Sequence, residues 1–263
     1  TTKSTDILNK VKGLKQSQED PNVKNTGNDT SDLGDSEGST GYNKAPVSSV
    51  EVKNDTNTGN TNTSGNANAA KLKLDETKKA FDEKLMAGTS GNISVFDRDS
   101  GLMAITPSSY DYGIMEEKDI VVTDLDGNVE EGWLRPSSEW KMHAEIYRNV
   151  EHVNAVVHTH SPYATSFAVL QKEIPVILIE MLPFLNGSLE VSPYASQGSS
   201  QVGLNAVPIL KRKNACLMAN HGVVAVGKDV DQAYLSSVYA QDVAKVYHMA
   251  LTVGTPVEIN GED

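Results

Sequence analysis

A pair of histidines, His158 and His160, ends the apolar run V-N-A-V-V-H-T-H (153–160) and could bind a metal ion. Side chains alternate between the faces of a β-strand, so both imidazoles would point to the same side. Their Cα atoms would lie about 6.5 to 7 Å apart at a rise of ~3.3 Å per residue. Two ring nitrogens can then approach one ion at ~2.0 to 2.1 Å. Without a third ligand such a pair is more often a polar patch, so a metal site needs another donor.

His221 is the best candidate for the third donor. The chain has six histidines, and two of them, His152 and His248, fall in stretches typical of a surface turn and an amphipathic helix. The segment A-C-L-M-A-N-H-G (215–222) has the pattern of a buried strand that ends in a tight bend at His221. Three histidines with an open fourth position are typical of catalytic rather than structural zinc.

Five segments resemble, in order, those of the class II aldolase family, which includes L-fuculose-phosphate aldolase and L-ribulose-5-phosphate 4-epimerase. They are A-G-T-S-G-N-I-S (87–94), T-P-S-S-Y-D-Y (106–112), P-S-S-E-W-K-M-H (136–143), V-V-H-T-H-S-P-Y-A-T (156–165) and A-N-H-G-V (219–223). The resemblance covers about residues 79 to 258. It implies that His158, His160 and His221 hold Zn²⁺.

Glu139 is the residue expected to transfer a proton. A carboxylate in the first turn of a helix is already favoured by the helix dipole. Near a zinc ion it could also ligate the metal without substrate and act as a base once substrate displaces it, and the resemblance implies both roles. His143, one turn further, is expected to be a packed or supporting group rather than a ligand. Lys141 is expected on the solvent side of its helix, which argues against a Schiff-base mechanism.

Three short loops rich in small hydroxyl residues could bind a phosphate. Residues 88–92 place two glycines around such side chains, which lets backbone N–H groups approach an anion. Residues 107–109 have similar chemistry, and residues 136–138 precede a helix whose N-terminus would attract phosphate. A tight turn or ordinary N-capping explains each loop taken alone. The resemblance implies these contacts to the substrate phosphate: Gly91, Asn92, Ser108, Ser109, Ser137 and Ser138.

Alternating apolar patterns predict the elements that position these residues. Helices are expected over 72–85, from 139 onward, and over 161–171, 201–211 and 230–251. The helix from 139 is expected to have a core face at Trp140, Met142, Ile146 and Tyr147. Strands are expected over 93–96, 102–106, 120–125, 128–132, 153–160, 176–181 and 215–219. The alternation indicates a layered α/β domain, and by itself it favours a mostly parallel sheet. The resemblance instead implies an α/β/α domain with a mostly antiparallel central sheet. It also implies a homotetramer with active sites between subunits.

The first helix departs from the family at Lys84. Many family members have a glycine here, just before a hydrophobic pair, so that the helix ends in a left-handed residue. With lysine at this position the helix is expected to be short.

Residues 1–70 differ in composition from the rest and are predicted to be a disordered extension before a domain at 71–263. The segment 54–68 contains one weakly apolar residue, Ala67, and cannot bury enough surface to offset its chain entropy. A short helix is conceivable over 5–14, as a docking peptide or, more simply, a fraying tail. Glycosylation sequons at Asn28 and Asn54 are expected by chance in such a segment.

Composition excludes several classes of partner. The net charge of −12 argues against nucleic acid, because phosphates along a groove would not be neutralised; a sugar phosphate needs only a few local donors. The single cysteine, Cys216, excludes an intrachain disulfide framework and a thiolate-rich metal site, and it suits the cytoplasm. No apolar run approaches the ~18 residues of a membrane span.

The sequence therefore favours a zinc-dependent aldolase that cleaves a short ketose phosphate, similar to L-fuculose 1-phosphate, to dihydroxyacetone phosphate and an aldehyde. A ketose-phosphate 4-epimerase or a methylthioribulose-phosphate-type dehydratase would use the same scaffold. A third interpretation is a non-catalytic module like the adducin head. The intact histidines and Glu139 argue against it. Aldolase members carry a catalytic tyrosine where this chain has Ile179, beside Glu180. A second one, in a C-terminal tail, has no counterpart before Asp263.

Overall fold

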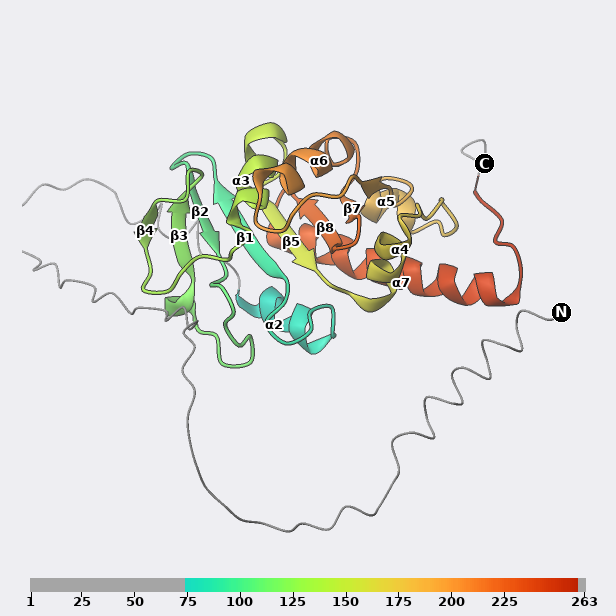
Figure 1. Cartoon of the computed structure of the whole chain (residues 1–263), viewed down its shortest axis with the longest axis horizontal. Helices are drawn as coiled ribbons and strands as arrows, with labels where there is room; N and C mark the ends of the chain where they lie inside the picture. Colours follow the sequence, from blue (N-terminus) through green and yellow to red (C-terminus); the bar gives the residue numbers. More distant parts are fainter. Residues whose placement is uncertain (1–73, 260–263) are drawn as a thin grey trace, which may run out of the picture. The chain divides into compact units, whose positions relative to one another are not determined.

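An eight-stranded sheet is the central layer of the computed structural model, which describes residues 74–259 (Figure 1). The strand order is β4-β3-β2-β1-β5-β8-β7-β6. Every neighbouring pair is antiparallel except β6 and β7, which are parallel. The expected mostly antiparallel sheet is confirmed, and the parallel sheet favoured by pattern alone is wrong. Hairpin-like turns, rather than helical crossovers, join β1 to β2, β3 to β4 and β7 to β8.

The elements have the following bounds. The strands are β1 (Asn92–Asp97), β2 (Leu102–Ile105), β3 (Val121–Asp124), β4 (Val129–Glu131), β5 (Ala155–Thr159), β6 (Val191–Ser192), β7 (Ala215–Met218) and β8 (Gly222–Gly227). The helices are α2 (Leu74–Asp82), the short 3-10 helix η1 (Glu117–Asp119), α3 (Trp140–Asn149), α4 (Pro162–Leu170), α5 (Met181–Leu185), α6 (Ser200–Leu210) and α7 (Val230–Val253).

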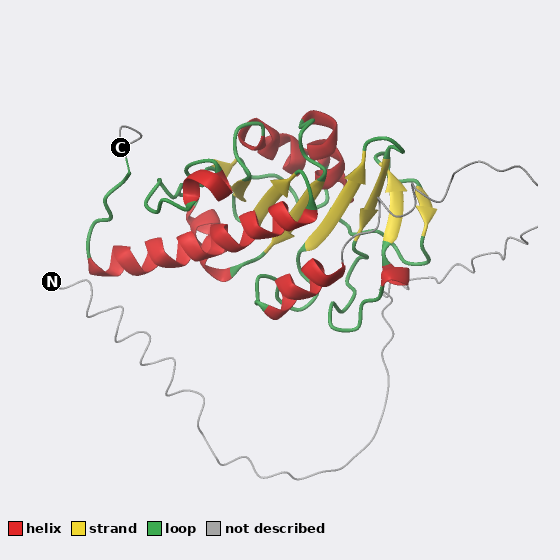
Figure 2. Ribbon diagram, turned by 180° about the vertical axis from the view of Figure 1, so that it is seen from behind, coloured by secondary structure: helices red, strands yellow, loops and turns green. Residues whose placement is uncertain are grey.

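Helices cover both faces of the sheet and bury its central strands completely. Val156 of β5 and Val224 of β8 pack in the cluster formed with α3 and α6. Val157 packs with α2 and the start of α7, and Val223 packs with α4, α5 and the rest of α7. The long helix α7 lies along this second face, as Figure 2 shows. Strands buried on both faces are apolar throughout, which is why β5 and β8 have the sequence pattern of parallel strands.

Most of the expected elements are present. The strands expected over 93–96 and 102–106 are β1 and β2, and the hairpin expected after residue 120 is β3 and β4. The helices expected over 161–171, 201–211 and 230–251 are α4, α6 and α7. Met142, Ile146 and Tyr147 form the buried face of α3. The two-residue strand β6 and the six-residue strand β8 were not anticipated.

The prediction of a strand over 176–181 is wrong. This apolar segment is irregular and leads into α5, while a single bridge joins Ile174 to Leu189 nearby. Val176 is only partly buried against the core, and Ile179 is 71% exposed. The place beside β7 is taken by β6. An apolar run predicts burial, but it does not decide which segment pairs with a sheet edge.

Helix α2 ends in a left-handed residue even though that residue is a lysine. Lys84 has φ +59°. Its N–H donates to the carbonyl of Phe81 (2.9 Å), and the N–H of Leu85 donates to that of Ala80 (3.0 Å). These two bonds are the pair that usually accompanies a C-terminal glycine. The helix is short, as expected, and ends at Asp82.

The disordered extension before residue 70, the helix over 5–14 and the two sequons lie outside the described residues. The domain boundary at 70/71 also stays a prediction. Within residues 74–259, no helix has the length and apolar character needed to cross a membrane.

We expect Lys84→Gly to stabilise the protein by about 1 kcal/mol, because a left-handed conformation strains a residue with a Cβ but not glycine. Lys84→Ala is the matched control, since it removes the exposed side chain and keeps the strain. Urea unfolding of both variants measures the difference. Equal unfolding free energies for the two would contradict the prediction.

Candidate metal and active site

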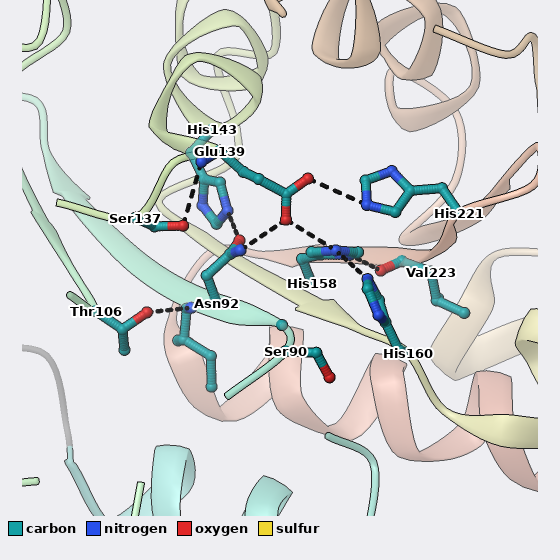
Figure 3. Close-up of polar contacts among 12 residues, drawn as sticks. Ser90, Asn92, Thr106, Ser137, Glu139, His143, His158, His160, His221 and Val223 are labelled. Carbon is teal, nitrogen blue, oxygen red and sulfur yellow. Dashed lines mark hydrogen bonds and ion pairs between the residues drawn. The ribbon is translucent and has the colours of Figure 1, made fainter. Parts of the chain in front are cut away.

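The pairing of β5 with β8 brings the three histidines together. His158 lies in β5 opposite Val224 of β8, and His160 directly follows β5. His221 lies in the turn between β7 and β8, one residue before β8 begins. The end of β5 is therefore beside the start of β8. One ligating nitrogen from each imidazole lies within 4.8 Å of the others (Figure 3), so the expected convergence is present.

His158 and His160 turn their Nε2 atoms toward one point. His158 Nδ1 lies 2.8 Å from the carbonyl oxygen of Val223, which can only accept, so Nδ1 carries the proton. Nε2 of His158 therefore faces the site and lies 3.0 Å from Nε2 of His160. Burial and the neighbouring histidines lower the pKa of His160 to about 4. An imidazole binds a metal in its neutral form.

Glu139 directs its carboxylate at the same point. It is the N-cap residue of α3, one position before the expected first turn, and its side chain makes no capping bond. Oε2 lies 3.2 Å from His158 Nε2, and Oε1 lies 3.1 Å from His221 Nε2. Burial alone would raise the pKa of this carboxyl, but His158 and His221 lower it well below its usual range. The carboxylate is therefore ionised although it is only 3% exposed.

Two buried polar atoms show that this group of residues fits a cation. Glu139 Oε1 and His221 Nε2 lie 3.1 Å apart, but neither has a partner in good hydrogen-bond geometry among the described residues. Buried polar atoms without partners cost roughly 1–3 kcal/mol each, and a shared cation would satisfy both. Three imidazole nitrogens and one carboxylate suit Zn²⁺, and other transition metals also accept such donors.

The turn that carries His221 is built for close approach. Asn220 adopts a left-handed conformation with φ +54°. A Cβ on Gly222 would lie 2.5 Å from the carbonyl oxygen of Thr159 and 2.9 Å from Cδ2 of His160. Only glycine therefore allows β8 to start this near the end of β5.

His143 supports the site from behind and is not one of the ligating group, as expected. It is fully buried on α3. Its Nε2 lies 2.5 Å from Asn92 Oδ1 and its Nδ1 lies 2.6 Å from Ser94 Oγ. The Asn92 amide nitrogen donates to Glu139 Oε2 at 2.9 Å. Asn92 thus has a contact with the carboxylate that the resemblance did not imply.

A cavity of about 310 Å³ opens beside Glu139 and His160. The three hydroxyl-rich loops line it together, and all six residues expected to contact phosphate are on its wall: Gly91, Asn92, Ser108, Ser109, Ser137 and Ser138. A bridge between Pro107 and Pro136 joins two of the loops. The Tyr112 hydroxyl holds the third by donating to the Gly91 carbonyl at 2.6 Å. Lys141 is exposed and is absent from the cavity wall, as expected.

Gln197 also lines the cavity and was not predicted. It belongs to the loop before α6, and Gly198 of the same loop would place a Cβ 3.3 Å from the Ser138 carbonyl. The sequence around it resembles an ordinary helix start. No local signal could have assigned it to the site, because the tertiary contact with residue 138 places it there.

Comparison with known proteins agrees with this geometry. Residues 74–248 match the family model described as the class II aldolase and adducin N-terminal domain. The chain is 37% identical over 179 residues to a 5-deoxy-D-ribulose 1-phosphate aldolase of Bacillus thuringiensis serovar kurstaki, covering 68% of this chain and 84% of that protein. It is 32% identical over 183 residues to a 5-methylthioribulose-1-phosphate/5-deoxyribulose-1-phosphate aldolase of Rhodospirillum rubrum, covering 70% and 81%.

A solved structure of an L-fuculose 1-phosphate aldolase superposes with a TM-score of 0.71 at 36% identity, covering 75% of this chain and 93% of that one. The fold and the site together define a metal-dependent lyase of the aldolase class. The chain belongs to the class II aldolase family.

We expect His221→Ala to lose most of its bound divalent metal, because it removes one of three imidazoles that converge on one point. The loss of zinc affinity should exceed the roughly 10- to 100-fold typical of supporting residues. Metal analysis of purified protein and competition with a chromogenic chelator measure it. His248→Ala, at an exposed histidine of α7, is the control. Equal metal content in the two variants would remove His221 from the site.

Proposed function

We propose that the protein is a Zn²⁺-dependent aldolase that cleaves a short ketose 1-phosphate, similar to L-fuculose 1-phosphate, to dihydroxyacetone phosphate and an aldehyde. One observation carries the proposal: Glu139 and His160 form part of the same cavity wall as the three hydroxyl-rich loops. A metal centre that supports carbon–carbon bond cleavage and a phosphate-binding site would then share one cavity, within reach of a single small sugar phosphate. The cytoplasm suits such an enzyme and its free, buried Cys216.

In this proposal the phosphate is bound by neutral donors. Within residues 74–259, no lysine or arginine is on the cavity wall. Ser108, Ser109, Ser137 and Ser138 supply hydroxyl groups, and the loops supply backbone N–H groups. Ser137 and Ser138 also precede α3, whose N-terminal end carries a partial positive charge. The cavity volume is at the lower end of small-molecule sites, about 300–1,000 Å³, which suits a short sugar.

Glu139 is proposed to move the proton on the carbon that becomes nucleophilic. Zn²⁺ held by His158, His160 and His221 would stabilise the negative charge of the enediolate left by bond cleavage. In the condensation direction, Glu139 removes the proton from the hydroxymethyl carbon. The C–H bond breaks, an O–H bond forms, and the electron pair passes to the enediolate. Cleavage returns the same proton to carbon.

The relatives favour a second candidate substrate. Two of them are named as aldolases of 5-deoxyribulose 1-phosphate, and one of these also of 5-methylthioribulose 1-phosphate. Such substrates lack the hydroxyl group on carbon 5, in the half of the sugar that leaves as the aldehyde. Ile179, at the position of the aldolase tyrosine, is 71% exposed and has no proton to give. A group other than Ile179 must therefore serve the aldehyde oxygen.

We also propose the homotetramer with active sites at subunit interfaces that the family resemblance implies. Val169 and Leu170 of α4 are 53% and 61% exposed. They lie beside Gln171, whose side-chain amide donates to Asn220 at 2.8 Å, next to His221. An exposed apolar surface thus adjoins the turn that carries a proposed metal ligand, and exposed apolar patches mark interaction sites.

Incubation of the zinc-loaded enzyme with L-fuculose, 5-deoxyribulose and 5-methylthioribulose 1-phosphates should release dihydroxyacetone phosphate from at least one. Glu139→Gln should retain zinc and lower turnover by about 10² to 10⁴, the usual contribution of general acid–base catalysis. A coupled glycerol-phosphate dehydrogenase assay measures both, with Glu173→Gln, at an exposed carboxylate, as the control.

Unchanged turnover in Glu139→Gln would remove Glu139 from the mechanism. An epimerised or dehydrated product in place of dihydroxyacetone phosphate would assign the enzyme to the alternative reactions. Protein without metal and without turnover would indicate a binding module like the adducin head.

Light scattering of the purified protein should give four times the 28.3-kDa mass of the chain. Leu170→Arg should reduce this mass and the turnover together, because it places a charge in the proposed interface. Val129→Arg, at a half-exposed residue of the edge strand β4, is the control. A Leu170→Arg variant that remains tetrameric would exclude α4 from the interface.

A further inference from the structure

Five buried side chains form a continuous path of hydrogen bonds that ends at Glu139. Tyr147 and Ser94 lie 2.7 Å apart, Ser94 and His143 2.6 Å, His143 and Asn92 2.5 Å, and Asn92 and Glu139 2.9 Å, measured between the bonded atoms. None of the five residues is more than 4% exposed. Figure 3 shows the part from His143 through Asn92 to the carboxylate. Tyr147, Ser94 and His143 are at most 1% exposed, so water does not compete for the bonds among them.

The carboxylate at the end fixes the direction of the bonds from Asn92 to Ser94. An ionised Glu139 can only accept, so Asn92 must face it with its amide nitrogen and present Oδ1 to His143. Oδ1 can only accept, so Nε2 of His143 carries a proton. Burial lowers the pKa of His143 to about 3 and keeps the ring neutral. Nδ1 therefore accepts from the Ser94 hydroxyl. The Tyr147 hydroxyl donates to the backbone carbonyl of Ser94 at 2.9 Å and also lies 2.7 Å from Ser94 Oγ.

The path makes the two oxygens of Glu139 unequal. Oε2 accepts the Asn92 N–H. Oε1 accepts no well-formed hydrogen bond from the described residues and only faces His221 Nε2 at 3.1 Å. A proton placed on Oε2 would point at a group that itself donates. If Asn92 turned over, its carbonyl oxygen would face the carboxylate and repel it. The Nε2–H of His143 prevents this turn, because it would then face an NH₂ group instead of an acceptor.

We propose that His143 is a positioning residue of the reaction: through Asn92 it commits Oε2 of Glu139 to a hydrogen bond and leaves Oε1 to exchange the proton with the substrate carbon. The proton transfer is the one given above, with the new O–H bond on Oε1. The role of His143 in turnover rests on the proposed function. The bond directions rest on the geometry alone, so the two can be tested separately.

The tautomer of His143 tests the bond directions without catalysis. Long-range ¹H–¹⁵N spectra of full-length, zinc-loaded protein labelled at histidine, assigned with His143→Gln, should show His143 protonated at Nε2 only. His158, which donates from Nδ1 to Val223, should show the opposite tautomer and is the internal reference. A proton on Nδ1 of His143 would overturn the proposal, because Asn92 would then face Glu139 with its oxygen.

Kinetics test the consequence for the reaction. His143→Leu should lower kcat by about 10- to 100-fold, the range typical of residues that orient a metal-site ligand, and leave KM for the ketose phosphate nearly unchanged. His143→Gln keeps an N–H donor for Asn92 and should recover most of this loss. Tyr147→Phe, which removes only the far end of the path, should have a smaller effect. His152→Leu, at an exposed histidine, is the control.

The outcomes separate the two proposals. Equal kcat in wild type and His143→Leu overturns the positioning role, and so does an equal loss in the Leu and Gln variants, which would indicate packing alone. If His143→Leu fails to fold, Ser94→Ala takes its place and should lower kcat with KM unchanged; an unchanged kcat there also overturns the role. A wild-type enzyme with the Nε2–H tautomer and no aldol cleavage would overturn the proposed function, and with it the role in turnover, while the bond directions stand.

Discussion

The antiparallel pairing of β5 with β8 is the constraint on which the rest of the site depends. His158 is fixed in the ladder opposite Val224, and the same register places the turn at Asn220–Gly222 beside His160. The contact is so close that a side chain at Gly222 would collide with the Thr159 backbone. Because helices bury both faces of these strands, the register cannot slip without exposing apolar side chains. The positions of the imidazoles are therefore a property of the sheet.

The carboxylate reaches this centre from a different layer. Glu139 stands at the start of α3, which packs on the same face of the sheet as Val156 and therefore on the face to which His158 points. Three imidazoles and one ionised carboxyl give a site that favours a cation. Hydroxyl and amide groups line much of the cavity beside it, and among the described residues no lysine or arginine is on its wall. A cation site thus lies beside a neutral site that could bind a phosphate, an arrangement that suits a small phosphorylated substrate.

Some of these features follow from local pattern, and others do not. The alternation of side chains in a strand is enough to predict that His158 and His160 lie on one side. The segment 176–181 has as apolar a sequence as β5 but forms no strand, because β6 occupies the place beside β7. Lys84 takes a left-handed conformation that its residue type disfavours, since Leu85 must reach the core. For segment 176–181 and for Lys84, packing in the complete fold overrode the local preference of the sequence.

The sequence by itself determined which groups are available for chemistry: two histidines in one strand, a third before a glycine, a glutamate at a helix start and three loops of small hydroxyl residues. Spacing along the chain is enough for this, because strand and helix periodicity are local. Only the tertiary structure decided that β5 and β8 are antiparallel neighbours, that Gln197 joins the cavity wall, and that Tyr147, Ser94 and His143 connect to Asn92 behind the carboxylate. These contacts join residues that lie far apart in the chain, such as His158 and Val223, which are 65 positions apart. Their free energy comes from packing and burial, which no local pattern records.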